Sequence, residues 1–405
     1  MNILFVHTNF PAQFRYLAEV LAADPANRVA AIGSQTAGQL RGVRLERYHF
    51  HDVGHAAVHS FARRFDSEAR RAEQVLYTLI ALENSGFVPD VIVAHSGWGE
   101  TLPLRAKFPR ARLVVYCEYF YREHGQDVHF DPEFPQFGVD GMTYLRAKNA
   151  SQLLALAECD LGLSPTLWQR STYPDEFQTK IAVAHEGVDT EAVRPDDQAA
   201  FRLPSGYALT ARSEVLTFVA RNLEPLRGYH VFMRALPEIL HARPQAQVVI
   251  VGGDGVSYGP SSPDGRSWKD VFWSEVAPRL DPRRVHFVGP LAYGSYLQLL
   301  QVSRAHVYLT YPFVLSWSLI EALSAGCLII GSDTGPVREV ITHGQNGLLV
   351  PFFDTRHLAA AAIAALGDPG RFAPLRQRAR GTAISGFERR RAAAGQLALL
   401  RSALR

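Results

Sequence analysis

The stretch YLTYPFVLSWSLIEALSAG, Tyr308–Gly326, combines the end of an apolar strand, a loop and the start of a helix. The helix is predicted to begin near Trp317 and to carry Glu321 one turn later. A helix N-terminus offers free backbone N–H groups and a positive dipole end, which suit a diphosphate, and Ser316 and Ser318 add hydroxyl donors. Glu321 could accept hydrogen bonds from a ribose. The plainer interpretation is that Ser316 only caps the helix and Glu321 complements its dipole.

The same alternation of short apolar strands and longer helical patterns runs through the whole chain. It predicts an α/β fold with parallel, doubly wound sheets. Helices are predicted at Gln13–Ala23, Ala62–Asn84 and Tyr144–Ala157. Strands are predicted at Asn2–His7, Arg28–Gly33, Asp90–His95, Arg112–Cys117, Asp160–Ser164, Lys180–Ala184, Val215–Ala220, Gln247–Gly252, Val285–Gly289, Ala305–Thr310, Cys327–Gly331 and Gly347–Val350.

The pattern breaks near His185–Arg212, a segment rich in proline and aspartate, and then restarts. Two Rossmann-like domains facing each other across a cleft are therefore predicted, at residues 1–200 and 201–380. Residues 381–405 are predicted to add a C-terminal helix that packs back on the first domain. Ligands of such folds lie beyond the carboxyl ends of the strands, so the cleft between the two domains is the expected site.

Composition narrows the class of protein. The 405 residues include 42 Lys+Arg and 39 Asp+Glu, and a net charge of +3 argues against a nucleic-acid partner. Only four of the basic residues are lysines, so a single arginine is weak evidence for phosphate binding. The three cysteines lie in apolar stretches, which favours buried, reduced thiols in a cytoplasmic protein. No signal peptide is recognised, and the longest apolar run, Leu358–Leu366, is too short for a membrane span.

Two arginines stand out because of their position in VLTFVARNLEPLRG, Val215–Gly228. Arg221 directly follows the predicted strand, and Arg227 precedes the next helix. Guanidinium groups at these two places could converge on one pyrophosphate.

Glycines follow the next strand in VVIVGGDG, Val248–Gly255, and let the backbone at Gly253 approach a ligand closely. The GxGxxG pattern fails, because Tyr258 stands where its last glycine should be. The sequence also lacks a P-loop and an Asp-x-Asp motif, which argues against a nucleotide held by magnesium. Neither a cofactor nor a metal is therefore expected.

In the first half of the chain, polar residues follow two predicted strands. His95 begins HSGWG, whose glycines Gly97 and Gly99 indicate a close backbone approach, and Glu118 follows the next strand. Both side chains are candidates for a ligand-binding site in the first domain. Alternatively, His95 is a hydrogen-bonded loop histidine, and the aromatic residues of Tyr116–Tyr121 are simply core.

The linked order of these motifs resembles the retaining glycosyltransferases of family four, and the resemblance covers nearly the whole chain. It is carried by four groups of residues, and by weaker matches at Glu186–Asp189, Pro11–Leu21 and Ser332–Leu349. The four groups are Arg221 with Arg227-Gly228, the turn Gly252–Gly255, the strand Val285–Gly289 and the helical segment Glu321–Gly326. The resemblance implies the GT-B architecture and metal-independent transfer of a sugar with retained configuration. It also implies that the first domain, residues 1–200, binds the acceptor and that the second, residues 201–380, binds the nucleotide sugar.

The chain departs from the family pattern at the donor site. The family has two glutamates eight positions apart; here Glu321 is the second, but Phe313 replaces the first, which helps to hold hydroxyls of the donor sugar. The first-loop Gly-Gly is replaced by Ala12-Gln13, so the Gln13 side chain could supply a donor instead. Glu118 takes the place where the family presents a histidine to the donor sugar.

The resemblance therefore implies a UDP- or GDP-sugar transferase acting on a hydroxyl acceptor. By the same resemblance, the acceptor is expected to be a glycan or glycolipid of bacterial surface polysaccharide or glycolipid synthesis, with peripheral contact of the protein at the inner face of the membrane. Two alternatives remain: a nucleotide-sugar-binding protein without transferase activity, which Phe313 supports, and a GT-B epimerase. The residues expected to act in catalysis are Arg221, Arg227, Glu118 and His95, and those expected to bind the donor are Gln13, Gly253, Leu291 in the base-reading segment, Phe313, Ser316, Trp317, Ser318 and Glu321.

Overall fold

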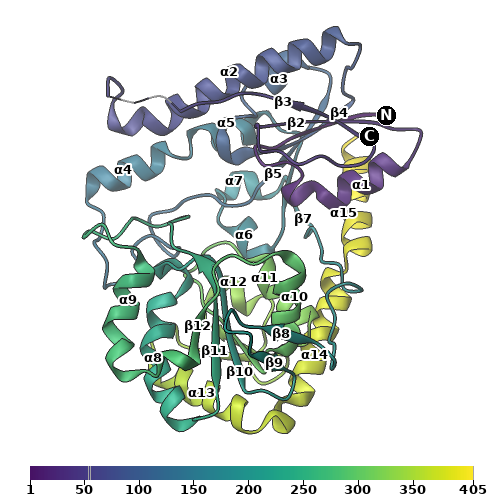
Figure 1. Ribbon diagram of the computed structural model, residues 1–405. Helices are drawn as coiled ribbons and strands as arrows, with labels where there is room; N and C mark the ends of the chain where they lie inside the picture. The colour runs from purple at the N-terminus through teal and green to yellow at the C-terminus, as the bar shows by residue number, and fades with distance from the viewer. Residues whose placement is uncertain (53, 55, 405) are drawn as a thin grey trace. The chain divides into compact units, whose positions relative to one another are not determined.

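The computed structural model describes residues 1–52, 54 and 56–404. The chain divides into two compact units, of which unit 1 comprises Met1–Gly187 and Arg389–Arg405 and unit 2 comprises Val188–Glu388 (Figure 1). Each unit is built on one parallel sheet with helices on its faces, so the predicted α/β class is confirmed. Residues 188–200, which the sequence assigned to the first domain, belong to unit 2.

Unit 1 has a seven-stranded sheet in the order β3-β2-β1-β4-β5-β6-β7. Because β1 pairs with both β2 and β4, the strand order reverses between β1 and β4, where α/β folds open a crevice for ligands. The strands are β1 (Asn2–Val6), β2 (Arg28–Gly33), β3 (Val43–Arg47), β4 (Val91–His95), β5 (Arg112–Tyr116), β6 (Leu161–Ser164) and β7 (Ile181–Val183).

Helices cover both faces of this sheet and enclose two buried apolar clusters. Leu400 of the C-terminal helix lies in the same cluster as Leu17 and Leu21, so α1 and α15 pack together on one face (Figure 1). The helices are α1 (Arg15–Ala23), α2 (Arg63–Asn84), α3 (Leu104–Lys107), α4 (Val139–Ala147), α5 (Ala150–Glu158), α6 (Leu167–Ser171), α7 (Asp175–Gln178) and α15 (Arg389–Ala403), with short 3-10 turns η1 (Ala12–Phe14), η2 (Ser60–Ala62) and η3 (Ser96–Trp98).

Unit 2 repeats the same plan with six strands in the order β12-β11-β10-β13-β14-β15. Its strand order reverses between β10 and β13, which are paired in parallel. The strands are β10 (Val215–Asn222), β11 (Gln247–Gly253), β12 (Val285–Phe287), β13 (Ala305–Tyr308), β14 (Ile329–Ser332) and β15 (Leu348–Val350), and a separate antiparallel hairpin joins β8 (Ala200–Arg202) to β9 (Ala208–Thr210).

The helices of unit 2 pack on both faces of its sheet (Figure 1). They are α8 (Tyr229–Ala242), α9 (Trp268–Val276), α10 (Tyr293–Val302), α11 (Trp317–Ser324), α12 (Gly335–Arg338), α13 (Thr355–Gly367) and α14 (Pro369–Phe387), with 3-10 turns η4 (Pro225–Arg227), η5 (Ala277–Arg279) and η6 (Pro282–Arg284). The three cysteines are buried and unbridged, as predicted. Among the described residues, no helix has the length and apolarity needed to cross a bilayer.

Four elements differ from the sequence prediction. The edge strand β3 was missed because its sequence, VRLER, is mostly polar, and the β8–β9 hairpin lies inside the predicted linker. The predicted helix Tyr144–Ala157 is two helices, since the side chain of Asn149 exchanges hydrogen bonds of 3.1 and 2.8 Å with the backbone of Tyr121 and breaks the helical run. Strand β10 continues to Asn222 through a register shift, so Arg221 lies within the strand instead of after it.

The turn after β10 depends on Gly228. Its φ is +69°, and a Cβ there would lie 2.4 Å from the Cβ of Leu309. Only glycine therefore permits the turn to approach the end of β13 this closely, which brings η4 against the loop ahead of α11.

Candidate functional site

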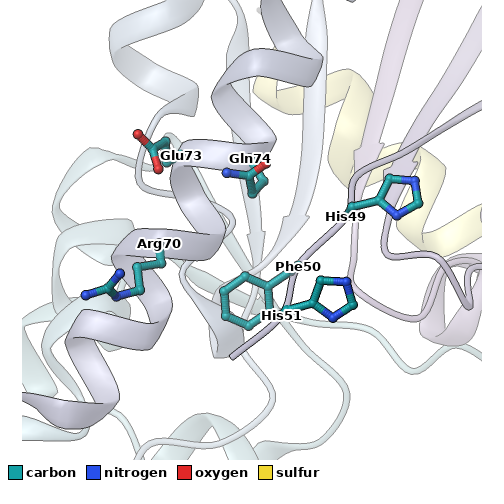
Figure 2. Close-up of a pocket in the computed structure, with 6 residues that line it drawn as sticks. All are labelled: His49, Phe50, His51, Arg70, Glu73 and Gln74. Atoms are coloured by element: carbon teal, nitrogen blue, oxygen red, sulfur yellow. The ribbon is translucent and has the colours of Figure 1, made fainter. Parts of the chain in front are cut away.

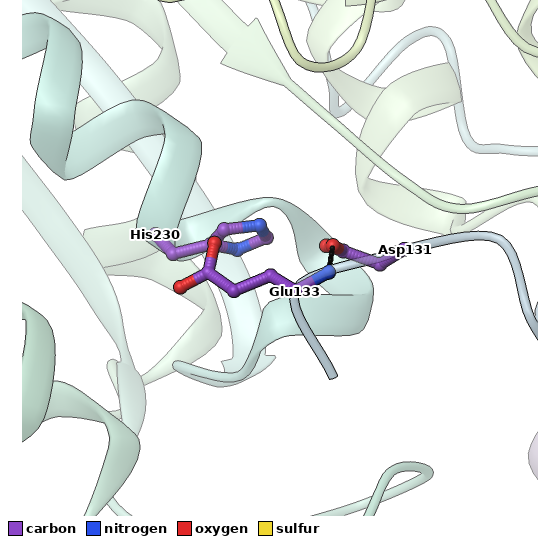
Figure 3. Close-up of side chains that lie close together, drawn as sticks. All are labelled: Asp131, Glu133 and His230. Atoms are coloured by element: carbon purple, nitrogen blue, oxygen red, sulfur yellow. Dashed lines mark hydrogen bonds between the residues drawn. The ribbon is translucent and has the colours of Figure 1, made fainter. Parts of the chain in front are cut away.

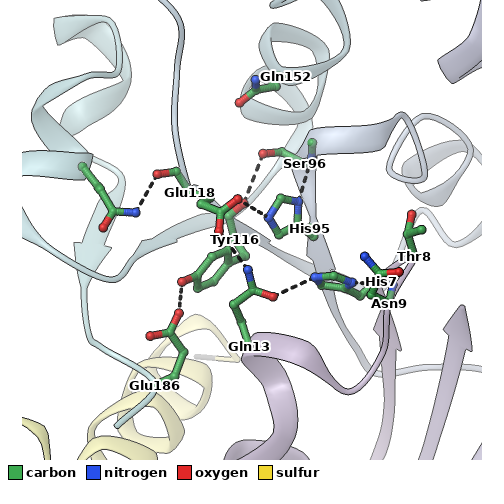
Figure 4. A network of polar contacts seen from close by, with 12 residues as sticks. His7, Thr8, Asn9, Gln13, His95, Ser96, Tyr116, Glu118, Gln152 and Glu186 are labelled. Atoms are coloured by element: carbon green, nitrogen blue, oxygen red, sulfur yellow. Dashed lines mark hydrogen bonds and ion pairs between the residues drawn. The ribbon is translucent and has the colours of Figure 1, made fainter. Parts of the chain in front are cut away.

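Two histidines lie at the strand reversal of unit 1. His7 directly follows β1, and His95 is the last residue of the neighbouring strand β4. Both side chains are buried, and their ring centroids lie 5.0 Å apart (Figure 4). Sequence analysis selected His95 because of its place at a strand end; the same rule applies to His7, which was missed.

Backbone contacts fix the tautomer of both rings. The Asn9 N–H donates to Nδ1 of His7, and the Gly97 N–H donates to Nδ1 of His95, each at 2.9 Å. A neutral imidazole whose Nδ1 accepts a hydrogen bond carries its proton on Nε2. Burial, reinforced by His95, lowers the pKa of His7 well below its ordinary value, so His7 is neutral near pH 7.

Both histidines are connected to the carboxylate of Glu118, His7 through the side chain of Gln13 and His95 directly. His7 Nε2 donates to Gln13 Oε1 at 2.8 Å, and Gln13 Nε2 donates to Glu118 Oε1 at 2.9 Å (Figure 4). His95 Nε2 lies 3.4 Å from the other oxygen of Glu118. The structure thus brings three predicted residues, Gln13, His95 and Glu118, into one network at the carboxyl end of the sheet.

The Glu118 side chain is held by polar neighbours and is still partly accessible to solvent. Its side chain is 33% exposed although both oxygens face polar partners, and the Gln169 side chain donates to its backbone carbonyl at 2.8 Å. A carboxylate held in one orientation at the edge of a protein crevice can accept a hydrogen bond from a sugar or acceptor hydroxyl.

A second carboxylate behind this network was not predicted. Glu100 is fully buried and accepts hydrogen bonds from Tyr48 Oη at 2.6 Å and from the Thr8 N–H at 2.9 Å. Burial raises the pKa of Glu100, and together with the Glu100 charge it also raises the pKa of Tyr48. No sequence signal marks this glutamate, because its donors come from two other strand ends.

The glycine-rich turn after β4 serves packing. Trp98 stacks on His95 with centroids 4.4 Å apart, and Gly99, at φ +83°, lets the loop pass the backbone of Glu68. A Cβ on Gly99 would lie 2.6 Å from the Glu68 carbonyl oxygen, so the close approach predicted from the glycine is to helix α2. Tyr116, Tyr119 and Phe120 are buried, which bears out the interpretation of these aromatics as core.

A pocket of about 260 Å³ opens where the chain leaves β3 and passes α2 (Figure 2). Arg71, next to the pocket, places its guanidinium 4.3 Å from the Phe50 ring and donates to the Trp98 carbonyl at 2.8 Å, which connects this pocket to the turn that carries His95. The pocket is lined by His49, Phe50, His51, Arg70, Glu73 and Gln74.

Figure 3 shows a tight turn further along unit 1, in which Asp131 accepts the Glu133 N–H at 3.0 Å. A turn of this kind reverses the direction of the chain locally. His230, drawn in the same figure, belongs to α8 of unit 2, where it is buried against the rings of Phe272 and Phe352.

Arg227 is the most unusual side chain at the strand reversal of unit 2. It is only 8% exposed, and its Nη1 donates to Thr310 Oγ1 at 2.9 Å and to the Val314 carbonyl at 3.1 Å. Across residues 1–52, 54 and 56–404, no carboxylate pairs with it. A buried cation normally has an anionic partner, so this position is suited to an anion.

Arg221 lies near the end of β10, ahead of η4, and its side chain is exposed. The two arginines therefore differ: Arg227 is fixed in the protein, and Arg221 extends into solvent. Beside them, Gly253 ends β11 opposite Asn222, whose side chain donates to Ser257 Oγ at 2.7 Å.

Phe313 contributes to an aromatic group around Arg227. It is 3% exposed, its ring centroid lies 4.9 Å from that of Tyr258, and the Arg227 guanidinium lies 5.7 Å from the Phe313 ring and 5.5 Å from the Tyr258 ring. Phe313, the residue predicted to replace the first glutamate of the family pattern, thus packs against Tyr258 next to Arg227.

Helix α11 begins at Trp317, as predicted. Ser316 is its N-cap: the Ser316 hydroxyl accepts the Ser318 N–H at 3.2 Å and lies 2.8 Å from the Ser318 hydroxyl. The Ser316 N–H itself donates to Tyr308 Oη at 2.8 Å. The capping interpretation of Ser316 is confirmed, and the Trp317 side chain remains 45% exposed.

Glu321 has two partners that sequence analysis did not identify. Tyr293 Oη donates to one carboxylate oxygen at 2.8 Å and Tyr296 Oη to the other at 2.9 Å. Both tyrosines lie in the first turn of α10, just after the partly buried Leu291, and their spacing of three residues was the available signal. Burial raises the pKa of Glu321, an effect that the two hydroxyls oppose.

Comparisons with known proteins agree with this architecture. Residues 25–193 match the family model described as the glycosyl transferase family 4 group, and residues 213–368 match glycosyl transferases group 1. D-inositol 3-phosphate glycosyltransferase from Rhodococcus jostii is 31% identical over 199 residues, 48% of this chain and 42% of the relative. The corresponding protein from Kribbella flavida is 29% identical over 47% of this chain and 44% of the relative. The alignments thus span less than half the length of these two relatives.

Solved structures resemble the whole fold. Sucrose-phosphate synthase from Thermosynechococcus elongatus has a TM-score of 0.74 at 17% identity, covering 99% of this chain and 98% of the other. Anabaena Alr3699/HepE, in complex with UDP and glucose, has a TM-score of 0.70 at 18% identity, covering 99% and 100%. The chain belongs to the GT-B glycosyltransferases of family 4, with a family 4 group segment followed by a glycosyl transferases group 1 segment.

Proposed function

We propose that this glycosyltransferase moves a sugar from a UDP- or GDP-sugar to a hydroxyl group with retention of configuration. Arg227 carries the proposal, because its buried guanidinium has no carboxylate partner among the described residues and lies at a strand reversal, a place suited to the diphosphate of the donor. Arg221, exposed near the end of β10, would add a second positive charge. Gly253, Leu291, Ser316, Trp317, Ser318 and Glu321 would complete the donor site.

The mechanism is stabilisation of the leaving group. Negative charge grows on the β-phosphate as the glycosidic bond breaks, and fixed cations stabilise that charge with little rearrangement. A phosphate oxygen on the same face can then take the acceptor proton, so retention needs no protein nucleophile. In this proposal two arginines supply the charge, and no metal or cofactor takes part.

The acceptor would bind to unit 1. Glu118, oriented by Gln13 and His95, would accept a hydrogen bond from a substrate hydroxyl. The pocket at Phe50 offers an aromatic ring surrounded by polar groups, a combination that suits a sugar ring. An acceptor from polysaccharide or glycolipid synthesis would fit, with peripheral membrane contact of the enzyme, and the names of the relatives add polyol phosphates to the acceptors worth testing.

Calorimetric titration with UDP, GDP, ADP and dTDP, with and without magnesium, tests the donor site. Micromolar, metal-independent binding of one nucleotide that is lost in Arg227→Met supports the proposal. Binding that requires magnesium contradicts the metal-free mechanism, and failure of all four nucleotides contradicts the donor site.

One observation favours a second function, a nucleotide-sugar-binding protein without transferase activity. Phe313, which is buried and packs against the exposed ring of Tyr258, puts aromatic surface where the family pattern has a carboxylate. Product analysis by mass spectrometry separates the possibilities: a new glycosidic bond identifies a transferase, an isomerised nucleotide sugar an epimerase, and nucleotide binding without a product a binding protein.

A further inference from the structure

We infer that His7 is a positioning residue: it sets the orientation of the Gln13 amide and thereby holds Glu118 in the orientation needed to contact substrate. The inference rests on the proposed function in one respect, the assignment of Glu118 to a substrate hydroxyl. The hydrogen bonds themselves connect four residues from three elements, Asn9, His7, Gln13 and Glu118 (Figure 4).

The first step is the proton on His7. Its Nδ1 already accepts the Asn9 N–H at 2.9 Å, so the neutral ring has a single N–H, at Nε2. His7 therefore acts only as a donor toward Gln13. Backbone geometry at Asn9, which no side-chain substitution removes, fixes this direction.

The second step concerns the orientation of the Gln13 side-chain amide. A glutamine side chain has nearly the same shape in either orientation, and its neighbours decide which end is the oxygen. Since His7 Nε2 donates, Gln13 turns its oxygen toward His7 at 2.8 Å and its NH2 group toward Glu118 at 2.9 Å. An amide does not titrate in this range, so the connection transmits orientation and no proton.

The third step concerns the orientation of the Glu118 carboxylate. Gln13 donates to Oε1 of Glu118, and His95 Nε2 lies 3.4 Å from Oε2, so the carboxylate is held from two sides. Loss of the Gln13 contact would remove one of these restraints on the rotation of the carboxylate about its terminal bond, and small misplacements of a reacting group reduce turnover strongly.

His7 also packs against aromatic rings, and a purely structural role must be separated from positioning. Its ring centroid lies 5.6 Å from that of Phe14 and 5.1 Å from that of Trp98. Any substitution removes this packing, so the test needs two variants that lose the ring equally but differ in the hydrogen bond they retain.

His7→Asn and His7→Gln form such a pair. The shorter amide of His7→Asn can replace Nδ1 and accept the Asn9 N–H, but it does not reach Gln13. The longer amide of His7→Gln can replace Nε2 and donate to Gln13. We expect His7→Asn to lower kcat by about tenfold or more with little change in the KM of the nucleotide sugar, and His7→Gln to stay within about threefold of wild type. Equal losses in both variants would overturn the inference.

A double variant identifies the target of the effect. If His7 acts through Glu118, His7→Asn lowers kcat much less in a Glu118→Gln background than in the wild type. Full additivity of the two losses would show that His7 acts elsewhere and would contradict the inference.

A measurement without substrate separates this inference from the proposed function. In ¹H–¹⁵N spectra the Gln13 side-chain amide is assigned by its loss in Gln13→Ala. We expect its proton shifts to move in His7→Asn and to remain near the wild-type values in His7→Gln. An unmoved signal in His7→Asn would overturn the inference even if transfer is observed. A moved signal in a protein that transfers no sugar would leave the hydrogen bonds established and the proposed function wrong.

Discussion

Arg227 Nη1 donates to Thr310 Oγ1 at 2.9 Å, and this hydrogen bond joins the turn after β10 to the chain that leaves β13. These are the two strands between which the order of the unit 2 sheet reverses. The guanidinium is therefore both a structural connection and the positive charge of the proposed diphosphate site. The two roles can be separated by comparing it with its exposed neighbour, Arg221.

Arg227→Met should lower the affinity for the bound nucleotide by about tenfold or more and should also lower the unfolding midpoint, because a buried hydrogen-bonded group is lost. Arg221→Ala should lower affinity and leave the midpoint nearly unchanged, since its side chain is exposed. Calorimetry and thermal unfolding measure the two quantities. Arg234→Met, which removes an outer ion pair with Glu275, is the matched control and should keep wild-type affinity. Unaltered nucleotide affinity in both Arg227→Met and Arg221→Ala would contradict the donor site.

Glu321 should make the stability of unit 2 depend on pH. Burial raises its pKa in the folded chain above that of the unfolded chain, so the folded state holds the proton more tightly. The resulting stabilisation is fully present below the unfolded pKa and is lost as pH rises through the folded pKa. Glu321→Gln, which resembles the protonated form, should therefore unfold at a higher temperature than wild type at pH 7 and at nearly the same temperature at pH 4. Glu238→Gln on exposed α8 surface is the control.

The tyrosines of α10 oppose this shift, and their removal should enlarge it. Tyr296→Phe deletes the 2.9 Å donor to an oxygen of the half-buried Glu321 carboxylate, which costs about 1–3 kcal/mol in the free energy of unfolding near pH 7. The loss should largely disappear in a Glu321→Gln background. A loss of the same size in both backgrounds would mean that Tyr296 stabilises the unit by packing alone.

Sequence reasoning located strands well because parallel strands buried on both faces are continuous apolar runs. It found His95 and Glu118 by their place at strand ends. It could not find Glu100, whose partners Tyr48 and Thr8 come from other parts of the chain. Contacts of that kind follow from strand order, which the sequence alone left open.

The position of a residue in the sequence was also a poor guide to the solvent exposure of its side chain. Sequence analysis assigned Arg221 and Arg227 to the same ligand, yet Arg221 is exposed and Arg227 is buried, because Gly228 brings η4 close to Leu309. The edge strand β3 lacked the apolar run on which the prediction depended. Glu321 pairs with Tyr293 and Tyr296. Their spacing of three residues was visible in the sequence, but the sequence did not show that Glu321 is their partner.

The pocket next to Phe50 should affect the acceptor and not the donor. Gln74→Ala removes a polar lining group, and we expect the KM of a glycan acceptor to rise several-fold with the KM of the nucleotide sugar unchanged. Glu19→Ala, on exposed α1 surface, is the control and should leave both constants at wild-type values. A rise in the KM of the donor would contradict the assignment of this pocket to the acceptor.

Phe313→Glu restores the carboxylate of the family pattern and gives the sharpest distinction between a transferase and a binding protein. The new charge would lie next to Arg227, whose guanidinium is 5.7 Å from the present ring, and would compete with the diphosphate for it. If the wild-type chain is a transferase, Phe313→Glu should weaken nucleotide binding and lower turnover, whereas Phe313→Leu, which keeps the site apolar, should change both less. If the wild-type chain only binds nucleotide sugars because this carboxylate is missing, Phe313→Glu should gain transfer activity. Mass spectrometry of the products with a panel of nucleotide sugars and acceptors measures which of the two occurs.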